Sequence, residues 1–197
     1  MTGIVIVDKP AGWTSQDVTA RLRRVFGTRR IGHGGTLDPM ATGVLPVFVG
    51  RATRGVEFFE HADKTYEAVL RLGTVTDTQD STGTVLEKRP VTVTEAEFRD
   101  ILPKFTGEIA QIPPMYSAIK VDGKKLYELA RAGKEIERKP REITVFSLDL
   151  LEFTGETAKI RVHCSKGTYS RTLGHDIGAA LGCGGCMETL RRTAAGE

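Results

Sequence analysis

The sequence has few cysteines and no long hydrophobic run, and each absence excludes a class of protein. Its 197 residues include only Cys164, Cys183 and Cys186, an odd number that argues against a disulfide framework. Cys183 and Cys186 have the spacing of half a zinc site, but no second ligand pair accompanies them, so we interpret this segment as a glycine-rich turn. No apolar run approaches the roughly 18 residues of a transmembrane helix. Because the start, "MTGIVIVDKP", also lacks a secretory leader, we expect a cytoplasmic protein without a membrane partner.

Motifs of several enzyme classes are missing as well. The sequence contains no GxxxxGK[ST] loop, no GxGxxG after a strand, no HExxH and no GxSxG. Its four histidines show no ligand spacing: His33, His61, His163 and His175. The residues therefore predict neither a metal site nor a cofactor.

Basic residues are gathered in two short segments, although the net charge is only +3. The first holds Arg21, Arg23, Arg24, Arg29 and Arg30, and the second holds Lys124, Lys125, Arg131, Lys134, Arg138, Lys139 and Arg141. Such clusters neutralise phosphates in nucleic-acid-binding proteins, but they also occur on solvated helix faces. Charge alone leaves the two interpretations open.

Hydrophobic periodicity predicts an α+β protein. Apolar runs or alternation indicate strands at residues 4–7, 64–73, 144–153 and 158–164. Helical spacing and capping residues indicate helices that begin near Ser15, after Thr94 and near Ser170. Because strands and helices do not alternate regularly, we expect one domain over residues 1–197, with a mixed, mainly antiparallel sheet flanked by helices.

The region after residue 111 is predicted to be irregular at first and then helical. We interpret "QIPPMYSAIK" as an exposed loop. Asp122-Gly123 is typical of a tight turn, and the apolar spacing that follows predicts a short basic helix ending at Gly133.

One carboxylate stands out in "GHGGTLDPMATG". Asp38 precedes a proline, which is typical of a helix N-cap with proline in the first turn. Alternatively, the glycines before it let the backbone approach a large ligand, and apolar neighbours such as Leu37 and Met40 would desolvate the acid. Both interpretations remain open at this point.

Five segments together resemble one enzyme family over nearly the whole chain, from about Ile4 to Arg192. They are "DKPAGWTS", "GHGGTLDPMATGVLPVFVGRATR", "KTYEAVLRLGTVTDTQD", "IPPMYSAIKVDGKKLYELARAG" and "HCSKGTYSRTLGHDIGAALG". In order and spacing they are similar to the bacterial tRNA pseudouridine synthase B family, which isomerises uridine 55 in the T loop of tRNA. The combination is highly specific, although each segment alone would be modest evidence.

The resemblance implies a role for particular residues. Asp38 would be the nucleophile, Arg171 its ion-pair partner, and Tyr66 the residue that stacks on the target base and is a candidate for moving the C5 proton. Tyr169 and Leu190 would line the pocket, Lys9 and Pro10 would support it, and His33 would insert where the base flips out. Gly35 and Thr36, in the same block as Asp38, would contact the substrate. One carboxylate suffices because the base never departs and no water is activated, whereas a glycosidase needs two acids.

The same resemblance implies the partner and the domain plan. It predicts a monomer that binds the T arm of tRNA without cofactor, metal or obligate protein partner, and a thumb-like RNA-binding insertion at about residues 112–141. The family's C-terminal PUA domain is absent, and we expect that the chain has been truncated. A non-catalytic tRNA-folding protein, a guide-RNA-dependent synthase and a small-molecule glycosyl hydrolase remain the alternatives.

Overall fold

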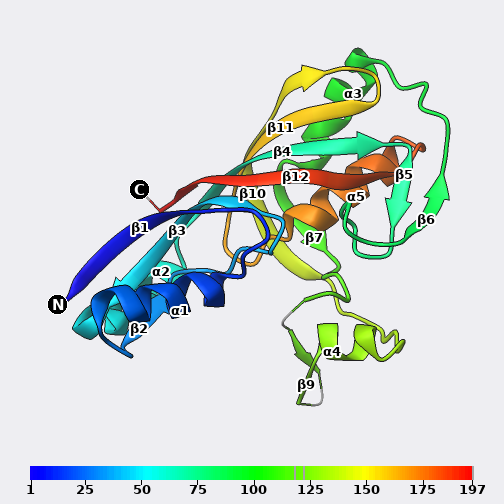
Figure 1. Ribbon diagram of the computed structural model, residues 1–197. Coiled ribbons are helices and arrows are strands. Elements are labelled where there is room, and N and C mark those ends of the chain that lie inside the picture. The colour runs from blue at the N-terminus through cyan, green and yellow to red at the C-terminus, as the bar shows by residue number, and fades with distance from the viewer. Residues whose placement is uncertain (118, 122, 197) are drawn as a thin grey trace.

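An eight-stranded sheet forms the body of the protein in the computed structural model, which describes residues 1–117, 119–121 and 123–196 (Figure 1). Its strand order is β1-β3-β12-β4-β11-β10-β7, with the short β2 paired to β3. The strands are β1 (Gly3–Lys9), β2 (Ile31–His33), β3 (Thr42–Val49), β4 (Lys64–Leu72), β7 (Gly107–Gln111), β10 (Arg141–Phe153), β11 (Thr157–Cys164) and β12 (Gly185–Ala195). Neighbours are antiparallel except β3 and β12, which run parallel. The expected mixed, mainly antiparallel α+β fold is confirmed.

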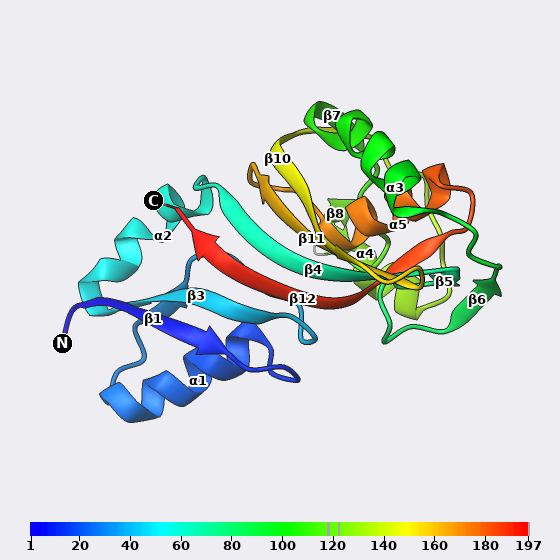
Figure 2. The ribbon, with the colours of Figure 1, turned by 90° about the horizontal axis from the view of Figure 1, so that it is seen from above.

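Helices cover both ends of this sheet. The elements are α1 (Ser15–Phe26), α2 (Val56–Glu60), α3 (Glu95–Ile101), α4 (Leu126–Arg131) and α5 (Ser170–Ala180), with 3-10 turns η1 (Gly50–Gly55) and η2 (Leu102–Phe105). Figure 2 shows α1 and α2 beside β1 and β3, and α3 near β10 at the other end. One hydrophobic core joins both ends, running from Val18 of α1 to Phe98 of α3 and Leu173 of α5. Among the described residues, no helix has the length and apolar character to cross a membrane.

Capping residues explain where α1 begins and ends. The Thr14 hydroxyl accepts a hydrogen bond from the Asp17 amide at 3.0 Å, and the Asp17 carboxylate accepts from the Thr14 amide at 2.8 Å. This capping box satisfies amides that the helix itself leaves unpaired and contributes about 1 kcal/mol. Gly27 ends the helix with φ 59°, a left-handed conformation that suits glycine. The predicted start of this helix is confirmed.

The alternation predicted for β4 and β11 is also confirmed. On β4, Ala68 and Leu70 are fully buried, and on β11 Ile160 packs in the same core. On the opposite face, Glu67 forms ion pairs with Arg161 at 2.7 Å and with Lys159 at 3.1 Å. One side of the sheet therefore faces the core and the other faces water.

Of the two interpretations of Asp38, the helix N-cap is wrong. Residues 39–40 form a turn, and residues 42–49 form β3. Gly43, at φ 103°, explains the difference, because a Cβ there would lie 2.1 Å from the carbonyl oxygen of Arg192. The close approach of β12 thus turns this segment into a strand, and no local pattern reveals it.

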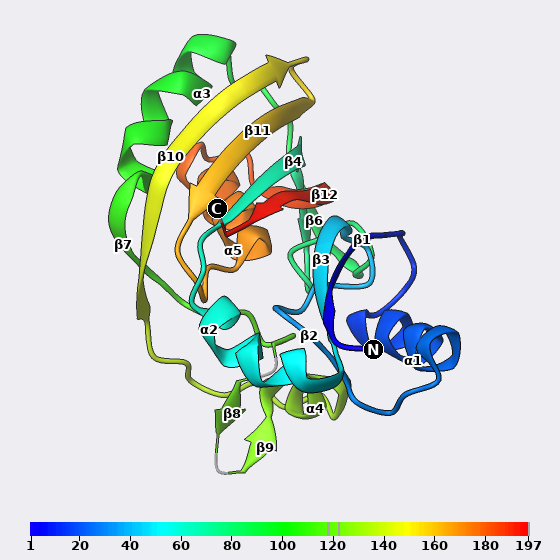
Figure 3. The ribbon, with the colours of Figure 1, turned by 90° about the vertical axis from the view of Figure 1, so that its left-hand side faces the viewer.

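The segment 112–117 is irregular as predicted, but it is not an exposed loop. Pro113, Pro114 and Ser117 are buried, and Tyr116 is half-buried. Beyond it, β8 (Lys120–Val121), β9 (Lys124–Lys125) and α4 form a small unit that projects from the body (Figure 3). The predicted short helix is therefore present, while Asp122 of the predicted turn lies outside the described residues. A second small sheet, β5 (Thr74–Thr76) with β6 (Val85–Lys88), lies near the end of β12 where that strand begins, at Gly185 (Figure 1).

The three cysteines are free, buried thiols. Burial raises the pKa of Cys164 to about 11, so this thiol stays protonated and unreactive at neutral pH.

Candidate active site

The structure brings Asp38 and Arg171 together from distant parts of the chain. Asp38 lies in the loop between β2 and β3, and Arg171 lies in the first turn of α5. The Arg171 Nε donates to Asp38 Oδ2 at 2.9 Å, and one terminal nitrogen lies 3.4 Å from Asp38 Oδ1. The ion pair that the resemblance implied is therefore present, and its two-point geometry fixes the direction in which the carboxylate points.

Arg171 is itself held by three further groups. Its side chain is 9% exposed, and it donates to the carbonyls of Tyr116 at 2.9 Å and Thr78 at 3.2 Å. On the side away from Asp38, it pairs with Asp80 Oδ2 at 3.4 Å. The guanidinium is thus fixed by both charge and backbone contacts, which leaves it little freedom to release Asp38.

Asp80 is a site residue that the sequence analysis missed. Its side chain is 5% exposed, and its Oδ1 accepts hydrogen bonds from Thr78 and from the amide and hydroxyl of Thr82. The neighbouring Gln79 has φ 65°, an uncommon conformation for a residue other than glycine, and such strain often marks functional loops. Asp80 closes one of the segments that carried the family resemblance, "KTYEAVLRLGTVTDTQD", and that was the available signal.

Lys9 holds the Asp38 loop in place through hydrogen bonds to backbone carbonyls. Its side chain is completely buried, and its Nζ donates to the carbonyls of Pro10 at 2.8 Å, Trp13 at 2.6 Å and Pro39 at 3.3 Å. Burial lowers the pKa of Lys9, while the negative charge of Asp38 opposes that shift. Lys9 therefore ties the end of β1 to the residue after Asp38. Pro10 is exposed and contributes its carbonyl to this arrangement.

A cavity of about 340 Å³ lies between β2, β4 and the segment that leads into α5. Several residues implied by the resemblance line it: His33, Gly35, Thr36, Tyr66 and Tyr169. Two buried cations that the sequence analysis did not assign, Lys64 and Arg192, line it too. Arg192 donates to the carbonyls of Val44 at 2.8 Å and Gly35 at 3.2 Å, so it links β12 to both ends of the Asp38 loop.

The two tyrosines of the cavity are neutral donors at physiological pH. Burial raises the pKa of Tyr66, and it also raises the pKa of Tyr169. The negative charge of Asp38 contributes to both increases, which places the carboxylate within electrostatic range of both phenols. Gln111 fixes the backbone of Tyr169 by donating to its carbonyl at 3.0 Å and accepting from its amide at 2.8 Å.

His33 and Leu190 occupy different environments. His33 lines the cavity, its Nδ1 is buried without a partner among the described residues, and burial lowers its pKa so that the ring is neutral at pH 7. Leu190 is 6% exposed and belongs to the hydrophobic core, opposite Ala68 of β4. The cavity described above does not include Leu190 among its lining residues.

Asp38 is less desolvated than the sequence suggested. Its side chain is 37% exposed, because Leu37 turns into the core instead of covering the carboxylate. A bound base would have to complete its desolvation. Among the described residues, no three His, Cys, Asp or Glu side chains are grouped as a metal site requires.

The position of Asp80 leads to a testable expectation. Asp80→Asn keeps the shape of the side chain but removes the negative charge that pairs with Arg171 on the side away from Asp38. Because small displacements of a catalytic group are costly, kcat should fall about 10- to 100-fold with KM little changed. Steady-state kinetics of the isomerisation that the family resemblance implies would measure this, with Asp149→Asn, an exposed carboxylate on β10, as the matched control. Equal kinetics for the two variants would contradict the positioning role.

Comparisons with known proteins agree with this arrangement. A family model described as "TruB family pseudouridylate synthase (N terminal domain)" matches residues 23–170, and one described as "tRNA pseudouridylate synthase B C-terminal domain" matches residues 171–197. The tRNA pseudouridine synthase B of Azoarcus sp. (strain BH72) is 53% identical over 195 residues, which cover 99% of this chain and 65% of that protein. The same enzyme of Pseudomonas fluorescens (strain Pf0-1) is 52% identical over 196 residues, covering 100% of this chain and 64% of that protein.

Solved structures show the same fold. A chain of a Cbf5-Nop10-Gar1 complex superimposes with a TM-score of 0.77 at 36% identity, covering 98% of this chain and 48% of that chain. A chain of an H/ACA RNP bound to a substrate RNA containing 2'-deoxyuridine gives a TM-score of 0.74 at 32% identity, with 98% and 47% covered. The chain thus spans about 65% of the length of the curated relatives named above. Both the matched models and the relatives show that the chain belongs to the TruB family of pseudouridylate synthases.

Proposed function

We propose that this protein converts uridine to pseudouridine in the T loop of tRNA, at position 55. The ion pair between Arg171 and Asp38, at 2.9 Å, is the observation that carries the proposal, and Asp38 follows by two residues Thr36, which lines the cavity that holds the two neutral tyrosines. Membership of the TruB family and the names of its relatives, tRNA pseudouridine synthase B, support the reaction and the substrate.

The reaction is an isomerisation, and its balance fits a site without a second acid. The N1–C1′ bond breaks and the C5–C1′ bond forms. The proton lost from C5 is matched by one gained at N1, so no water and no redox equivalent is consumed. Asp38 would bond transiently to C1′ of the ribose or to C6 of the base, while the uracil turns within the cavity.

The surrounding residues would share the remaining tasks. Arg171 aims the carboxylate, Tyr66 stacks on the base and is placed to move the C5 proton, and Tyr169 closes the opposite side. The uridine must first flip out of the folded loop, and the neutral His33 would fill the space that it leaves. Because RNA binding places the base against Asp38, the substrate itself would exclude water from this partly open carboxylate.

Residues 112–141 would act as a thumb on the RNA. Lys124, Lys125 and Arg131 lie on its β9 and α4, and Tyr116 at its root contacts Arg171 through its carbonyl. Closure of this unit on the T arm would therefore reach Arg171 directly. We propose that the single catalytic domain acts as a monomer, without a protein partner.

An assay on a minimal substrate tests the proposal and separates it from guide-dependent activity. The purified protein should convert the target uridine both in a tRNA transcript and in an isolated T-arm hairpin with no other RNA or protein present. Chemical labelling and primer extension would locate the product at a single uridine, and a hairpin with cytidine at that position is the control. Conversion only after a guide RNA is added would favour the guide-dependent alternative, and release of free uracil would favour a hydrolase.

A further inference from the structure

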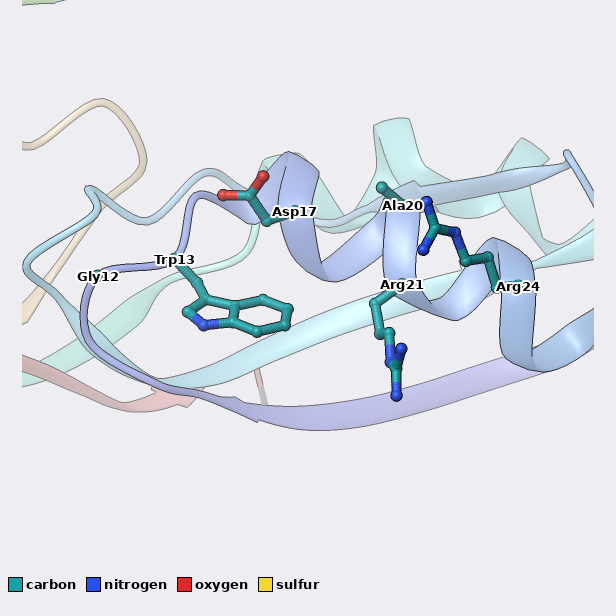
Figure 4. Close-up of a pocket in the computed structure, with 6 residues that line it drawn as sticks. All are labelled: Gly12, Trp13, Asp17, Ala20, Arg21 and Arg24. Atoms are coloured by element: carbon teal, nitrogen blue, oxygen red, sulfur yellow. The ribbon is translucent and has the colours of Figure 1, made fainter.

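A shallow groove of about 430 Å³ lies along α1, outside the cavity described above (Figure 4). Gly12, Trp13, Asp17, Ala20, Arg21 and Arg24 line it. The Trp13 ring lies beside the first turns of α1, Arg21 extends from the helix on the same side, and Arg24 folds back toward Ala20 (Figure 4). The volume falls in the range of roughly 300–1,000 Å³ that small ligands occupy, which is the size class of a nucleotide.

Trp13 offers an exposed aromatic ring. The residue is 42% exposed, although tryptophan is usually well buried. Within the described part of the chain, Lys125 and Arg131 are the cations that lie over an aromatic ring, and both contact Tyr127 and not Trp13. An exposed indole beside basic side chains is a typical platform for stacking a nucleobase.

The arginines around this groove have no partners in the described structure. Arg71, Arg99, Arg161 and Arg191 form ion pairs with carboxylates elsewhere in the protein. In contrast, none of the arginines between residues 21 and 54 makes a side-chain hydrogen bond or ion pair with the described residues: Arg21, Arg23, Arg24, Arg29, Arg30, Arg51 and Arg54. Of these arginines, Arg21 and Arg24 line the groove, and their unpaired guanidinium groups are complementary to phosphates.

Asp17 makes the groove suited to a nucleotide more than to a simple anion. Its Oδ2 is occupied by the amide and hydroxyl of Thr14, at 2.8 and 2.7 Å, and these bonds lower the pKa of the carboxyl so that it is ionised at neutral pH. Its Oδ1 has no partner among the described residues. A carboxylate oxygen accepts from a ribose hydroxyl or a base amino group but repels a free phosphate.

The groove is attached directly to the Asp38 loop. The Gly12 amide donates to the carbonyl of Pro39 at 2.8 Å, and Lys9 bridges the carbonyls of Trp13 and Pro39 at 2.6 and 3.3 Å. The Lys9 side chain therefore connects the backbone of Trp13 to Pro39, the residue that follows Asp38, through hydrogen bonds. An RNA whose uridine reaches Asp38 would therefore have neighbouring nucleotides within reach of this groove.

We propose that Trp13, Asp17, Arg21 and Arg24 form a second nucleotide-binding site, which holds an RNA nucleotide near the one that reacts. The indole stacks on the base, the two arginines bind the flanking phosphates, and Asp17 accepts from the ribose or the base. The identity of the RNA as tRNA rests on the proposed function, but the site itself rests on the groove.

Trp13 is the only tryptophan in the sequence, so its fluorescence reports on this site alone. The Asp38→Asn variant titrated with a tRNA transcript should lose most of its tryptophan emission, and bound RNA should shield the indole from acrylamide. The same experiment on Asp38→Asn/Trp13→Phe supplies the background. Saturable RNA binding, measured by filter retention, with unchanged emission and unchanged acrylamide access would overturn the proposal.

Kinetic variants give a second, independent test. Loss of one stacked base should raise KM for tRNA about 5- to 150-fold in Trp13→Ala, with kcat within twofold, and Trp13→Phe should restore most of the affinity. Arg21→Gln/Arg24→Gln should reduce the slope of log K against log salt by about 2. Each variant has a matched control. Leu151→Ala, the control for Trp13→Ala, removes an apolar residue of similar exposure, 39%. Lys88→Gln/Lys104→Gln, the control for the arginine pair, removes the same charge from β6 and from η2, which follows α3 (Figures 1 and 2).

The two proposals fail in different ways. If the wild-type protein forms no pseudouridine, the proposed function is wrong, whatever the fluorescence shows. If pseudouridine forms but Trp13→Ala has the KM and salt dependence of Leu151→Ala, only the second site is wrong.

Discussion

Replacing Asp38 with asparagine is expected to abolish pseudouridine formation while leaving tRNA binding within about twofold of the wild type. Asparagine has nearly the same shape but cannot attack carbon, so kcat should fall by about 10⁴-fold or more, as losses of covalent nucleophiles do. The fold should tolerate the change, because a carboxylate that is 37% exposed contributes less than about 1 kcal/mol through its ion pair. Single-turnover conversion and filter binding on the same tRNA would measure the two effects.

Asp100→Asn, which changes an exposed carboxylate on α3, is the control for this experiment. Conversion by Asp38→Asn at a rate near that of the control would refute the role of Asp38. The same variant also addresses the tRNA-folding alternative. If Asp38→Asn still accelerates tRNA refolding, the protein has a folding activity that does not depend on chemistry.

Removing Arg171 is expected to reduce both activity and stability strongly. Arg171→Ala would leave Asp38 and the buried Asp80 without the guanidinium that pairs with both of them. Breaking a buried ion pair from one side costs about 3–5 kcal/mol, which corresponds to a decrease in Tm of roughly 6–20 °C for a protein of this size. Activity should be undetectable, and differential scanning calorimetry would measure the loss of stability.

Arg171→Lys separates catalysis from folding. Lysine keeps the charge, but it cannot contact two carboxylates and two carbonyls at once, so kcat should fall about 100-fold while most of the stability is retained. Arg161→Lys, in an exposed pair with Glu67, should change neither. Wild-type turnover in Arg171→Lys would show that the geometry of the guanidinium does not matter and would contradict our account of the ion pair.

Local patterns were enough to predict the elements that carry their own signals. The capping box of α1 joins residues three positions apart, and the alternation of β4 repeats every two residues. Such features depend on neighbours in sequence, so a single sequence reveals them. The resemblance to the family added Asp38 and Arg171 as a pair across 133 positions, a contact that no periodicity could predict.

The missed features depend on contacts between distant segments. Residues 42–49 form a strand because Arg192 of β12 lies against Gly43, and β12 itself has little hydrophobic alternation, because it carries Glu188, Arg191 and Arg192. Asp80 meets Arg171 across 91 positions. Tertiary packing overrides local preference at these places, and they are also the places where the candidate site is built.

The sheet order has a consequence for how the protein assembles during synthesis. β12 lies between β3 and β4, although every other strand of the sheet precedes it in the sequence. Until residues 185–195 have left the ribosome, the half that carries Asp38 and the half that carries Arg171 share no strand pairing, and each exposes an unpaired edge. A chain released before this strand is made would therefore be inactive and prone to aggregate.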